Sequence, residues 1–462
     1  MLKVLSPFDQ SLIKEIPLDG SNKVEEALEV AHKLFLDQSN WLSAYKRIEI
    51  LERVVEVMKD RISFLTKLAA SEGGKPLMDS EVEVLRAING VKIAIESIGR
   101  LVGEEVPMGL TAASENRIAF TTKEPIGVVV SISAFNHPLN LIIHQVVTAI
   151  AAGCPVIIKP ALTTPLSCLA FVDILKEVGL PSGWCQAIIC ENDLAQTLAT
   201  DHRVNYVSFI GSAKVGWALK SKLAPGTRCA LEHGGSAPVI VEADSDLSEL
   251  LPALCKGGFY HAGQVCVSVQ RVYVNQSIVK GVSEGLSLLA KDLVVGDQMN
   301  KNTEVGPLIL PSEVDRVELW VKEAIDEGAE LLCGGKRISD TCYAPTVLLN
   351  PSAKSLVSQQ EIFGPVVCIY SYYSRDEAIR LANSLPFHFQ ASVFTKNIDV
   401  AMDTVKKLNA TAVMVNDHTA FRVDWMPFGG RDVSGIGIGG IEHSMQEMSR
   451  EKLTVIKQGV IN

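Results

Sequence analysis

Apolar and polar positions follow two different rhythms along the chain. In the first hundred residues apolar side chains recur every three or four positions, over residues 24–36, 45–71 and 80–102. That spacing places them on one face of a helix, so the sequence predicts helices packed as a layer. At 107–124 the pattern changes to a turn-rich stretch around Ala112–Asn116 followed by RIAFTTKEP. This pattern predicts a hairpin, which we expect to protrude and to meet another subunit.

Beyond this hairpin, short β-branched runs alternate with helical stretches. One series extends from Ile126 to a helix that begins near Ser212, and a second extends from Pro238 to Asp417. Such alternation is typical of parallel sheets with right-handed crossovers. The sequence therefore predicts an α/β fold of two lobes with a cleft between them.

Composition narrows the class of protein. At about 150 residues per domain, the 462 residues predict two or three domains, and 47% apolar with 21% charged residues is ordinary for a globular protein. A net charge of −10 argues against nucleic acid as a partner. The most apolar stretch, 139–158, is interrupted by polar residues, glycine and proline, so it predicts a buried helix and strand and no membrane span.

The N-terminus and the cysteines bear on location. The segment MLKVLSPFDQ lacks the basic start and apolar run of a secretory signal, and ten cysteines are scattered without a repeated spacing. We therefore expect reduced thiols and a cytoplasmic protein. Cys185 and Cys190 are the two cysteines closest in sequence, but no second pair or histidine cluster completes a tetrahedral zinc site. No metal is therefore expected.

Two glycine-containing segments are candidates for binding a phosphate. In SFIGSAKVG, Gly211 and Ser212 follow a predicted strand and open a helix, where free backbone N–H groups and the helix dipole attract an anion. Such residues also cap many helices that bind no ligand, so both interpretations stay open. A nominal G-x-G-x-x-G at Gly435–Gly440 has no predicted strand before it, and we interpret it as a loop.

A thiol and a carboxylate are candidates for covalent catalysis. Cys266 follows the small Gly263-Gln264 step, and Glu232 lies beside a glycine pair that permits close approach of a ligand. A thiol nucleophile near a carboxylate that activates water can form and then hydrolyse a covalent intermediate. Taken separately, the two residues are more often a core cysteine and a surface glutamate than a catalytic pair, and their spacing does not show that they meet.

Seven motifs occur in order over nearly the whole chain: FNHPLN, IIKPA, FIGSAKVG, LEHGG, GQVC, EIFGP and PFGG. In this order and at these separations they resemble the aldehyde dehydrogenase superfamily. The resemblance implies two Rossmann-like α/β lobes with parallel sheets, an NAD(P)-binding domain of residues 1–106 and 126–233 and a catalytic domain of 234–442. A small β oligomerisation element would comprise 107–125 and 443–462, in a homodimer or homotetramer.

The resemblance also implies roles for single residues. Cys266 would attack the aldehyde carbonyl to give a thiohemiacetal, which loses a hydride and becomes a thioester. The amide of Asn136 and the backbone N–H of Cys266 would hold the oxyanion, at roughly 3–4 kcal/mol per donor, and Glu232 would activate the hydrolytic water. The residues implied to hold NAD+ or NADP+ are Lys159, Gly211, Ser212, Glu361 and Phe363.

The sequence departs from the family pattern near the cofactor and the general base. Leu162 stands where many NAD-preferring members have an acid that binds both ribose hydroxyls, and Lys214 lies nearby. NADP+ is therefore plausible, and the preference stays open. His233 follows the general base directly, and Gly439 replaces a carboxylate that assists it in many members; the role of His233 is left open.

The residues expected at the substrate mouth are His137, Arg422 and Phe428. Arg422 with His137 could bind a carboxylate, phosphonate or sulfonate, since a guanidinium matches such anions with paired hydrogen bonds, and His418 adds to this cationic cluster. Alternatively, Arg422 pairs with Asp417 or Asp424. The features look most like a lactaldehyde and phosphonoacetaldehyde dehydrogenase branch. The predicted substrate is therefore a short hydroxyaldehyde such as lactaldehyde, or a small anionic aldehyde such as phosphonoacetaldehyde or a semialdehyde.

Two other functions are weighed against this one. A CoA-acylating dehydrogenase would pass its acyl group to CoA, but such members generally lack the glutamate found here as Glu232. A non-catalytic structural or binding member of the fold would be expected to lose Cys266, Asn136 or Glu232, and all three are present.

Overall fold

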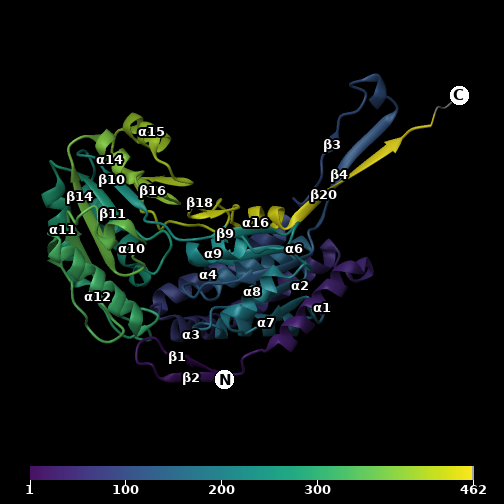
Figure 1. Ribbon diagram of the computed structural model, residues 1–462, viewed down its shortest axis with the longest axis horizontal. Helices are drawn as coiled ribbons and strands as arrows, with labels where there is room; N and C mark the ends of the chain where they lie inside the picture. The colour runs from purple at the N-terminus through teal and green to yellow at the C-terminus, as the bar shows by residue number, and fades with distance from the viewer. Residues whose placement is uncertain (460–462) are drawn as a thin grey trace.

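The computed structural model describes residues 1–459 as two α/β lobes and an arm that projects from the first lobe (Figure 1). The described residues contain no helix that is long and apolar enough to cross a membrane. A short N-terminal hairpin, β1 (Leu2–Leu5) with β2 (Leu12–Ile16), precedes the first helix. The sequence pattern did not predict this hairpin, because its strands are short and mostly exposed.

The first lobe is built on a six-stranded sheet. Its strands are β5 (Val128–Ile132), β6 (Val156–Lys159), β7 (Cys185–Ala187), β8 (Val204–Ile210), β9 (Arg228–Glu232) and β19 (Gly435–Ile436). They lie in the order β19-β9-β8-β5-β6-β7, and all pairings are parallel except that of β19 at the edge. β5 and β6 are almost fully buried, as expected for parallel strands covered on both faces.

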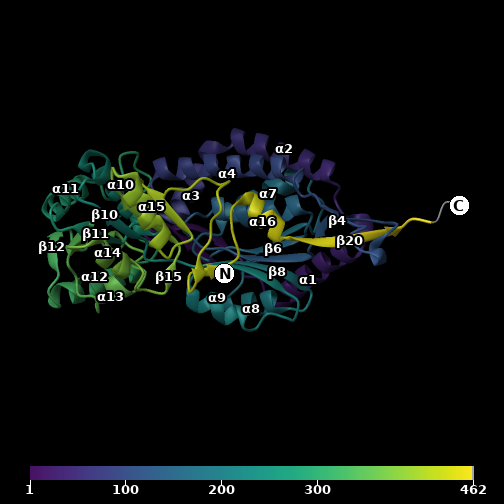
Figure 2. The same cartoon turned by 90° about the horizontal axis from the view of Figure 1, so that it is seen from above.

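Helices cover this sheet (Figure 2). The predicted helical layer consists of α1 (Ser21–Leu36), η1 (Gln38–Asn40), α2 (Ala44–Asp60), α3 (Ile62–Gly73) and α4 (Leu77–Ile98). The crossover helices are α5 (Asn140–Ile142), the π-helical turn η3 (Ile143–Val147), α6 (Thr148–Ala152), α7 (Leu166–Glu177), α8 (Asn192–Thr200) and α9 (Ala213–Lys220). The apolar faces of α2 and α4 pack into one core with α6 and α7, which confirms the helix predictions from apolar spacing.

The second lobe is built on a seven-stranded sheet. Its strands are β10 (Pro238–Val241), β11 (Arg271–Asn275), β12 (Glu330–Cys333), β13 (Thr346–Leu349), β14 (Val366–Tyr372), β16 (Gln390–Phe394) and β17 (Ala412–Val415). Its helices are α10 (Leu247–Phe259), η4 (Tyr260–Gly263), α11 (Val279–Asp292), α12 (Pro311–Asp326), α13 (Leu356–Gln359), α14 (Arg375–Ala382) and α15 (Ile398–Lys407). The order is β12-β13-β14-β11-β10-β16-β17, and only the edge strand β12 is antiparallel.

The arm is a three-stranded sheet. It contains β3 (Glu105–Val106), the turn η2 (Ala112–Ser114), β4 (Arg117–Pro125) and β20 (Ser449–Lys457), which follows α16 (Ile441–Glu447). β4 pairs with β3 as the predicted hairpin, but its longer partner is the C-terminal β20, in antiparallel register from Ser449↔Pro125 to Lys457↔Arg117. Residues 460–462 of the predicted oligomerisation element lie outside the described residues.

The interpretation of Gly435–Gly440 as a plain loop was wrong. Its first two residues form β19, which pairs with β9 so that Gly435 lies opposite Glu232, and β18 (Arg431–Asp432) pairs with β15 (Phe387–His388) just before it. A segment from the predicted catalytic stretch 234–442 therefore adds a strand to the sheet of the first lobe. A two-residue strand has no apolar alternation, so no sequence pattern could predict it.

Candidate active site

A cavity of about 1040 Å³ lies between the two lobes. Both lobes contribute lining residues, and the cavity brings together all the site residues predicted from the sequence: Asn136, His137, Lys159, Gly211, Ser212, Glu232, Cys266, Glu361, Phe363, Arg422 and Phe428. The predicted cleft is therefore confirmed as the place where these residues meet.

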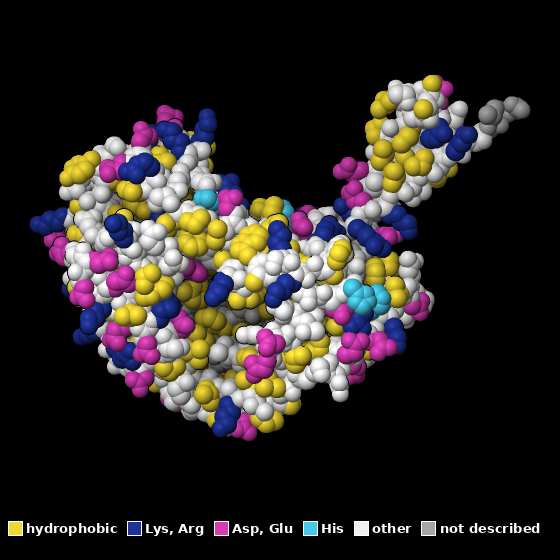
Figure 3. Space-filling view, viewed as in Figure 1, with side chains coloured by type: hydrophobic (Ala, Val, Ile, Leu, Met, Phe, Trp, Pro, Cys, Tyr) yellow, Lys and Arg dark blue, Asp and Glu magenta, His cyan; other side chains and the backbone are white. Residues whose placement is uncertain are grey.

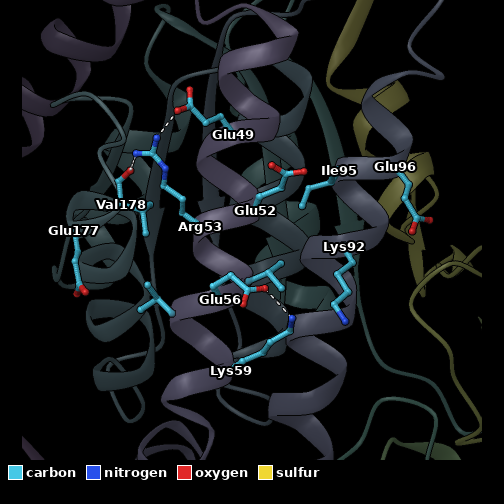
Figure 4. Close-up of a pocket in the computed structure, with 12 residues that line it drawn as sticks. Glu49, Glu52, Arg53, Glu56, Lys59, Lys92, Ile95, Glu96, Glu177 and Val178 are labelled. Carbon is cyan, nitrogen blue, oxygen red and sulfur yellow. Dashed lines mark hydrogen bonds and ion pairs between the residues drawn. The ribbon is translucent and has the colours of Figure 1, made fainter.

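A second hollow lies on the outer face of the helical layer, between α2 and α4 (Figure 4). It is lined mainly by charged side chains, among which Lys59 pairs with Glu56 at 2.8 Å and Arg53 pairs with Glu49. It contains none of the predicted site residues, and we do not consider it a candidate active site.

The loop that carries Cys266 begins with a left-handed turn. In η4, His261, Ala262 and Gly263 have φ values of 49°, 53° and 71°, a costly conformation for the two non-glycine residues. Gln264 then fixes the loop, because its buried side chain donates to the carbonyl of Pro307 (3.2 Å) and accepts from the backbone N–H of Ile309 (2.9 Å). Sequence reasoning did not assign this role to Gln264, although it is part of the GQVC motif.

Asn136 reaches this loop from the other lobe. It follows β5, is 6% exposed, and donates from Nδ2 to the backbone carbonyl of Gln264 at 2.9 Å. The carbonyl lies two residues before Cys266, so the amide is held beside the thiol. One of the two Nδ2 hydrogens remains for another acceptor.

Burial controls the charge of the thiol. It raises the pKa of Cys266 to about 12, the carboxylate of Glu361 acts in the same direction, and the guanidinium of Arg422 opposes the shift. Cys266 is therefore a neutral thiol in the resting protein.

Glu232 ends β9 at the carboxyl edge of the first sheet, where α/β proteins place their ligand sites. Burial raises its pKa, and Arg422 again opposes the shift. A Cβ atom at position 439 would come within 2.5 Å of Glu232 Oε1. Gly439 thus leaves the space into which the Glu232 carboxylate extends. A glutamate at position 439, as the family resemblance implies for many members, would collide with Glu232 in this position.

His233 belongs to the cofactor side of the cavity. Its Nδ1 lies 3.0 Å from the carbonyl oxygen of Gly211, and its ring packs against Phe209 and Trp217. Burial lowers its pKa, so the neutral ring donates to that carbonyl. These contacts give His233 a part in holding the strand-to-helix turn.

The residues predicted to hold the cofactor all line the cavity. Lys159 ends β6, Ser212 precedes the first residue of α9, and Phe363 contacts Phe135 edge-on with ring centroids 5.8 Å apart. Leu162 and Lys214 also line the cavity, so no acid occupies the position of Leu162 to repel a 2′-phosphate.

The surroundings of Glu361 show whether the residues predicted to hold the cofactor fit a nicotinamide dinucleotide. It packs over Gly234, where any side chain would collide with its carboxylate, and burial raises its pKa to about 8. Its Oε1 is buried and has no hydrogen-bond partner among the described residues. Such an oxygen needs a donor, and a ribose hydroxyl supplies one, so the residues fit the cofactor. No cluster of possible metal ligands occurs in the described part of the chain.

The histidines at the substrate end are not cations, which corrects the expected cationic cluster. Lys75 lies 2.8 Å from His137 Nδ1 and also pairs with the buried Glu83. Because burial and the Lys75 charge hold the pKa of His137 well below its usual range, the ring is a neutral acceptor. Burial likewise lowers the pKa of His418. These partners are distant in sequence, so the motif could not reveal them.

Arg422 lines the cavity together with Cys266 and Glu232. Its guanidinium carbon lies 3.5 Å from the ring centroid of Phe428, and it forms no ion pair with any residue that the structure describes. The alternative pairing is therefore wrong: Asp424 pairs with Arg86 and His144, while Asp417 accepts from the backbone N–H of His418. Arg86, which sequence reasoning missed, also lines the cavity.

Comparisons with known proteins agree with this site. A family model described as the aldehyde dehydrogenase family matches residues 1–454. The chain belongs to the aldehyde dehydrogenase family. It is 37% identical over 456 residues to 3-sulfolactaldehyde dehydrogenase of Priestia aryabhattai (98% of this chain, 94% of the relative). It is 36% identical over 462 residues to lactaldehyde dehydrogenase of Methanocaldococcus jannaschii (99% and 97%).

A solved structure of aldehyde dehydrogenase 21 from Physcomitrella patens, in complex with the reaction product succinate, superposes with a TM-score of 0.96 at 33% identity, covering 100% of this chain and 96% of that one. Other matching aldehyde dehydrogenase structures hold NADP or NAD+. The predicted fold, family and lactaldehyde-like branch are confirmed. The enzyme catalyses NAD(P)+-dependent oxidation of an aldehyde.

Proposed function

We propose that the enzyme oxidises a short aldehyde with an anionic group at its far end and releases the free acid by hydrolysis. The observation that carries this proposal is the Arg422 guanidinium, which lines the cavity with Cys266 and Glu232 and has no ion-pair partner among the described residues. Burial lowers its pKa, and its Nε atom has no hydrogen-bond partner there. A carboxylate, sulfonate or phosphonate would satisfy both the charge and the donors.

The relatives support an anionic substrate. One acts on an aldehyde that carries a sulfonate, and another was crystallised with succinate. Arg86 also lines the cavity, and its Asp424 partner leaves part of its guanidinium free of protein hydrogen bonds. Together Arg422 and Arg86 would place two guanidinium groups near the anionic end of the substrate.

In the proposed mechanism the Glu232 carboxylate takes the proton of Cys266 Sγ and later releases it to solvent, while the sulfur forms a bond to the carbonyl carbon. The Asn136 amide, already held at the Cys266 loop, and the Cys266 backbone N–H donate to the oxygen that becomes negative. Lys159, Ser212 and Glu361 would hold NAD(P)+, which would supply the hydride acceptor that conversion of the thiohemiacetal to a thioester requires. Glu232 then takes a proton from water as the water oxygen attacks the thioester carbon, and the C–S bond breaks to release the acid and restore Cys266.

Glu232 also decides between water and CoA. Its carboxylate lines the cavity, and burial raises its pKa above the ordinary value, which makes it a stronger base for the proton of water. This favours hydrolysis over acyl transfer to CoA. A second candidate substrate is neutral lactaldehyde, which the Methanocaldococcus jannaschii relative oxidises according to its name.

Assembly and location belong to the same proposal. The arm exposes apolar side chains that a partner subunit would cover, which supports a homodimer or homotetramer. All ten cysteines lie in the described part of the chain and carry free thiols, which supports a reducing compartment such as the cytoplasm.

A substrate panel tests the proposed function. We would measure formation of the reduced cofactor with succinic semialdehyde, lactaldehyde and butanal, for the wild type, Arg422→Met and the inactive control Cys266→Ser. Loss of charged hydrogen bonds should lower kcat/KM for succinic semialdehyde by about tenfold or more in Arg422→Met. The value for butanal should fall less, because butanal loses only the effect of the guanidinium on the pKa of Cys266. Equal losses for all aldehydes would refute an anionic substrate, and a wild-type preference for lactaldehyde would favour the second candidate.

A further inference from the structure

Arg422 lies in a segment that has no regular secondary structure. We call residues 417–428 the substrate loop; it connects β17 to β18 across the mouth of the cavity. The contacts of Arg422 itself are weak restraints, because its guanidinium rests on the Phe428 ring and forms no ion pair among the described residues. Its position must therefore be determined elsewhere in the loop.

Two side chains attach the substrate loop to the rest of the protein. Thr419 donates to the backbone carbonyl of Val267, just after Cys266, at 2.7 Å. At the other end Asp424, which is 2% exposed, accepts hydrogen bonds from groups of the first lobe. These groups are Arg86 Nη2 (2.8 Å), Arg86 Nε (3.2 Å), Asn140 Nδ2 (3.2 Å) and His144 Nε2 (2.8 Å).

The π-helical turn η3 supplies one of these donors. Burial lowers the pKa of His144 to about 4, so a neutral ring donates its Nε2–H to Asp424. The next residue, Gln145, donates to the carbonyl and hydroxyl of Ser208 in the sheet. Turns of this kind frequently occur at functional sites, and this one links the substrate loop to the carboxyl edge of the sheet.

The charge of Asp424 suits this position. Burial alone would raise its pKa, but hydrogen bonds from His144 and the nearby Arg86 hold the pKa well below the usual range. Asp424 is therefore an anion that pairs with Arg86 and leaves the charge of Arg422 unpaired.

We propose that Asp424 is a positioning residue for anion recognition. By anchoring the substrate loop to α4 and η3, it directs the guanidinium of Arg422, two residues earlier, into the cavity that holds Cys266. This inference rests on the proposed function, in which Arg422 binds the anionic end of the aldehyde. A residue that only stabilised the fold would affect neutral and anionic reagents alike.

The first experiment measures the preference of the cavity for an anionic reagent, without a substrate. Iodoacetate and iodoacetamide have nearly the same shape but differ in charge, and the rate of alkylation at Cys266 is measured by peptide mass spectrometry. In the wild type the guanidinium should favour iodoacetate, and Asp424→Asn should lower the iodoacetate-to-iodoacetamide rate ratio by about threefold or more, as Arg422→Met does. The control Asp417→Asn changes an acid to an amide in the same loop, outside the cavity, and should leave the ratio unchanged.

The second experiment uses the aldehyde panel. Asp424→Asn should raise KM for succinic semialdehyde by about tenfold and lower kcat by less than about threefold, while kcat/KM for butanal should change by less than about threefold. The Arg422→Met/Asp424→Asn double variant should be no worse than Arg422→Met alone, because the two residues act as one unit. The conservative variant Arg86→Lys keeps a cation for Asp424 and should retain most of the selectivity if Asp424→Asn folds poorly.

The outcomes separate the two proposals. If the wild type does not prefer anionic aldehydes but Asp424→Asn lowers the alkylation ratio, the proposed substrate class fails and the anchoring role stands. An unchanged ratio in Asp424→Asn, or in Arg422→Met, would overturn the anchoring role. Additive losses in the double variant would overturn it as well.

Discussion

The Cys266 thiol is half-buried near the carboxyl groups of Glu361 and Glu232 and the guanidinium of Arg422, and this environment predicts its reactivity. Because burial raises its pKa to about 12, the thiolate fraction should increase about tenfold per pH unit between pH 7 and 9. Alkylation of the cofactor-free enzyme by iodoacetamide should therefore accelerate with pH without reaching a plateau in that range. The rate at the Cys266 peptide, measured by mass spectrometry, checks this expectation.

Arg422→Met provides the comparison for this profile. The guanidinium lowers the pKa of Cys266, so its removal should raise that pKa and slow alkylation at every pH in the range. A plateau near pH 8 in the wild type would contradict the expectation, since it would show that the resting enzyme already stabilises a thiolate.

Residue types and motifs predicted the nucleophile, the amide and the base, but not the charge of their neighbours. His137 illustrates the difference: the FNHPLN motif placed it at the substrate mouth, whereas its neutral state follows from burial and from Lys75 on another segment. Arg422 is a second example. It forms no ion pair with Asp424 because Asp424 pairs with Arg86 and His144 instead. Such properties arise from contacts between distant segments, which one sequence does not contain.

At the scale of elements, Glu72 joins two helices of the first lobe. Glu72 lies near the end of α3, is 0% exposed, and accepts from the backbone N–H groups of Leu166 (2.6 Å) and Ser167 (2.7 Å) in the first turn of α7. α7 has no side-chain cap of its own. Glu72→Ala would bury two unsatisfied N–H groups, which costs about 2–4 kcal/mol, and should lower the thermal midpoint by about 4 °C or more.

Differential scanning fluorimetry measures this midpoint, and Glu81→Ala is the matched control. Glu81 is exposed on α4, and exposed substitutions usually change stability by about 0.5 kcal/mol or less. Equal midpoints for the two variants would show that α7 begins without help from Glu72.

The elements that the sequence predicted well are those with long apolar patterns. The helices α1 to α4 and the strands β5, β6 and β8 fall where apolar spacing predicts them. The pattern did not reveal β1, β2 or β19, because strands this short or exposed have too few buried positions to alternate. The apolar pattern also could not predict that β4 pairs with β20, since pairing of distant strands depends on topology. The family resemblance, in contrast, placed the C-terminal strand in the same element as the hairpin.

At the scale of the whole molecule, the described part of the arm has exposed apolar side chains and an unpaired strand edge, which packing within a single chain does not explain. Figure 3 shows hydrophobic side chains gathered on it. In β20 of the arm, Leu453 is 56% exposed and Val455 is 49% exposed. β20 pairs only with β4 among the described residues, so its other edge is open along nine residues. Proteins seldom leave so long a strand edge unpaired, and this supports the proposed association of subunits through the arm.

The double variant Leu453→Lys/Val455→Lys tests this role. The two side chains lie on one face of β20, because they are two residues apart, and two charges there should prevent burial against a partner. Light scattering after size-exclusion chromatography should show a shift from the oligomer toward the mass of one chain. Leu288→Lys/Leu319→Lys, at exposed apolar positions of α11 and α12 in the second lobe, is the matched control and should keep the wild-type mass.

The same variant separates assembly from catalysis. Every residue proposed for the reaction lines one cavity within a single chain, and the arm contributes none of them. The monomer should therefore bind cofactor and keep kcat/KM within about threefold of the wild type, although its thermal midpoint should fall because binding of a partner no longer stabilises it. An unchanged mass would contradict the role of the arm, whereas a monomer without activity would show that the cavity depends on the neighbouring subunit for its shape.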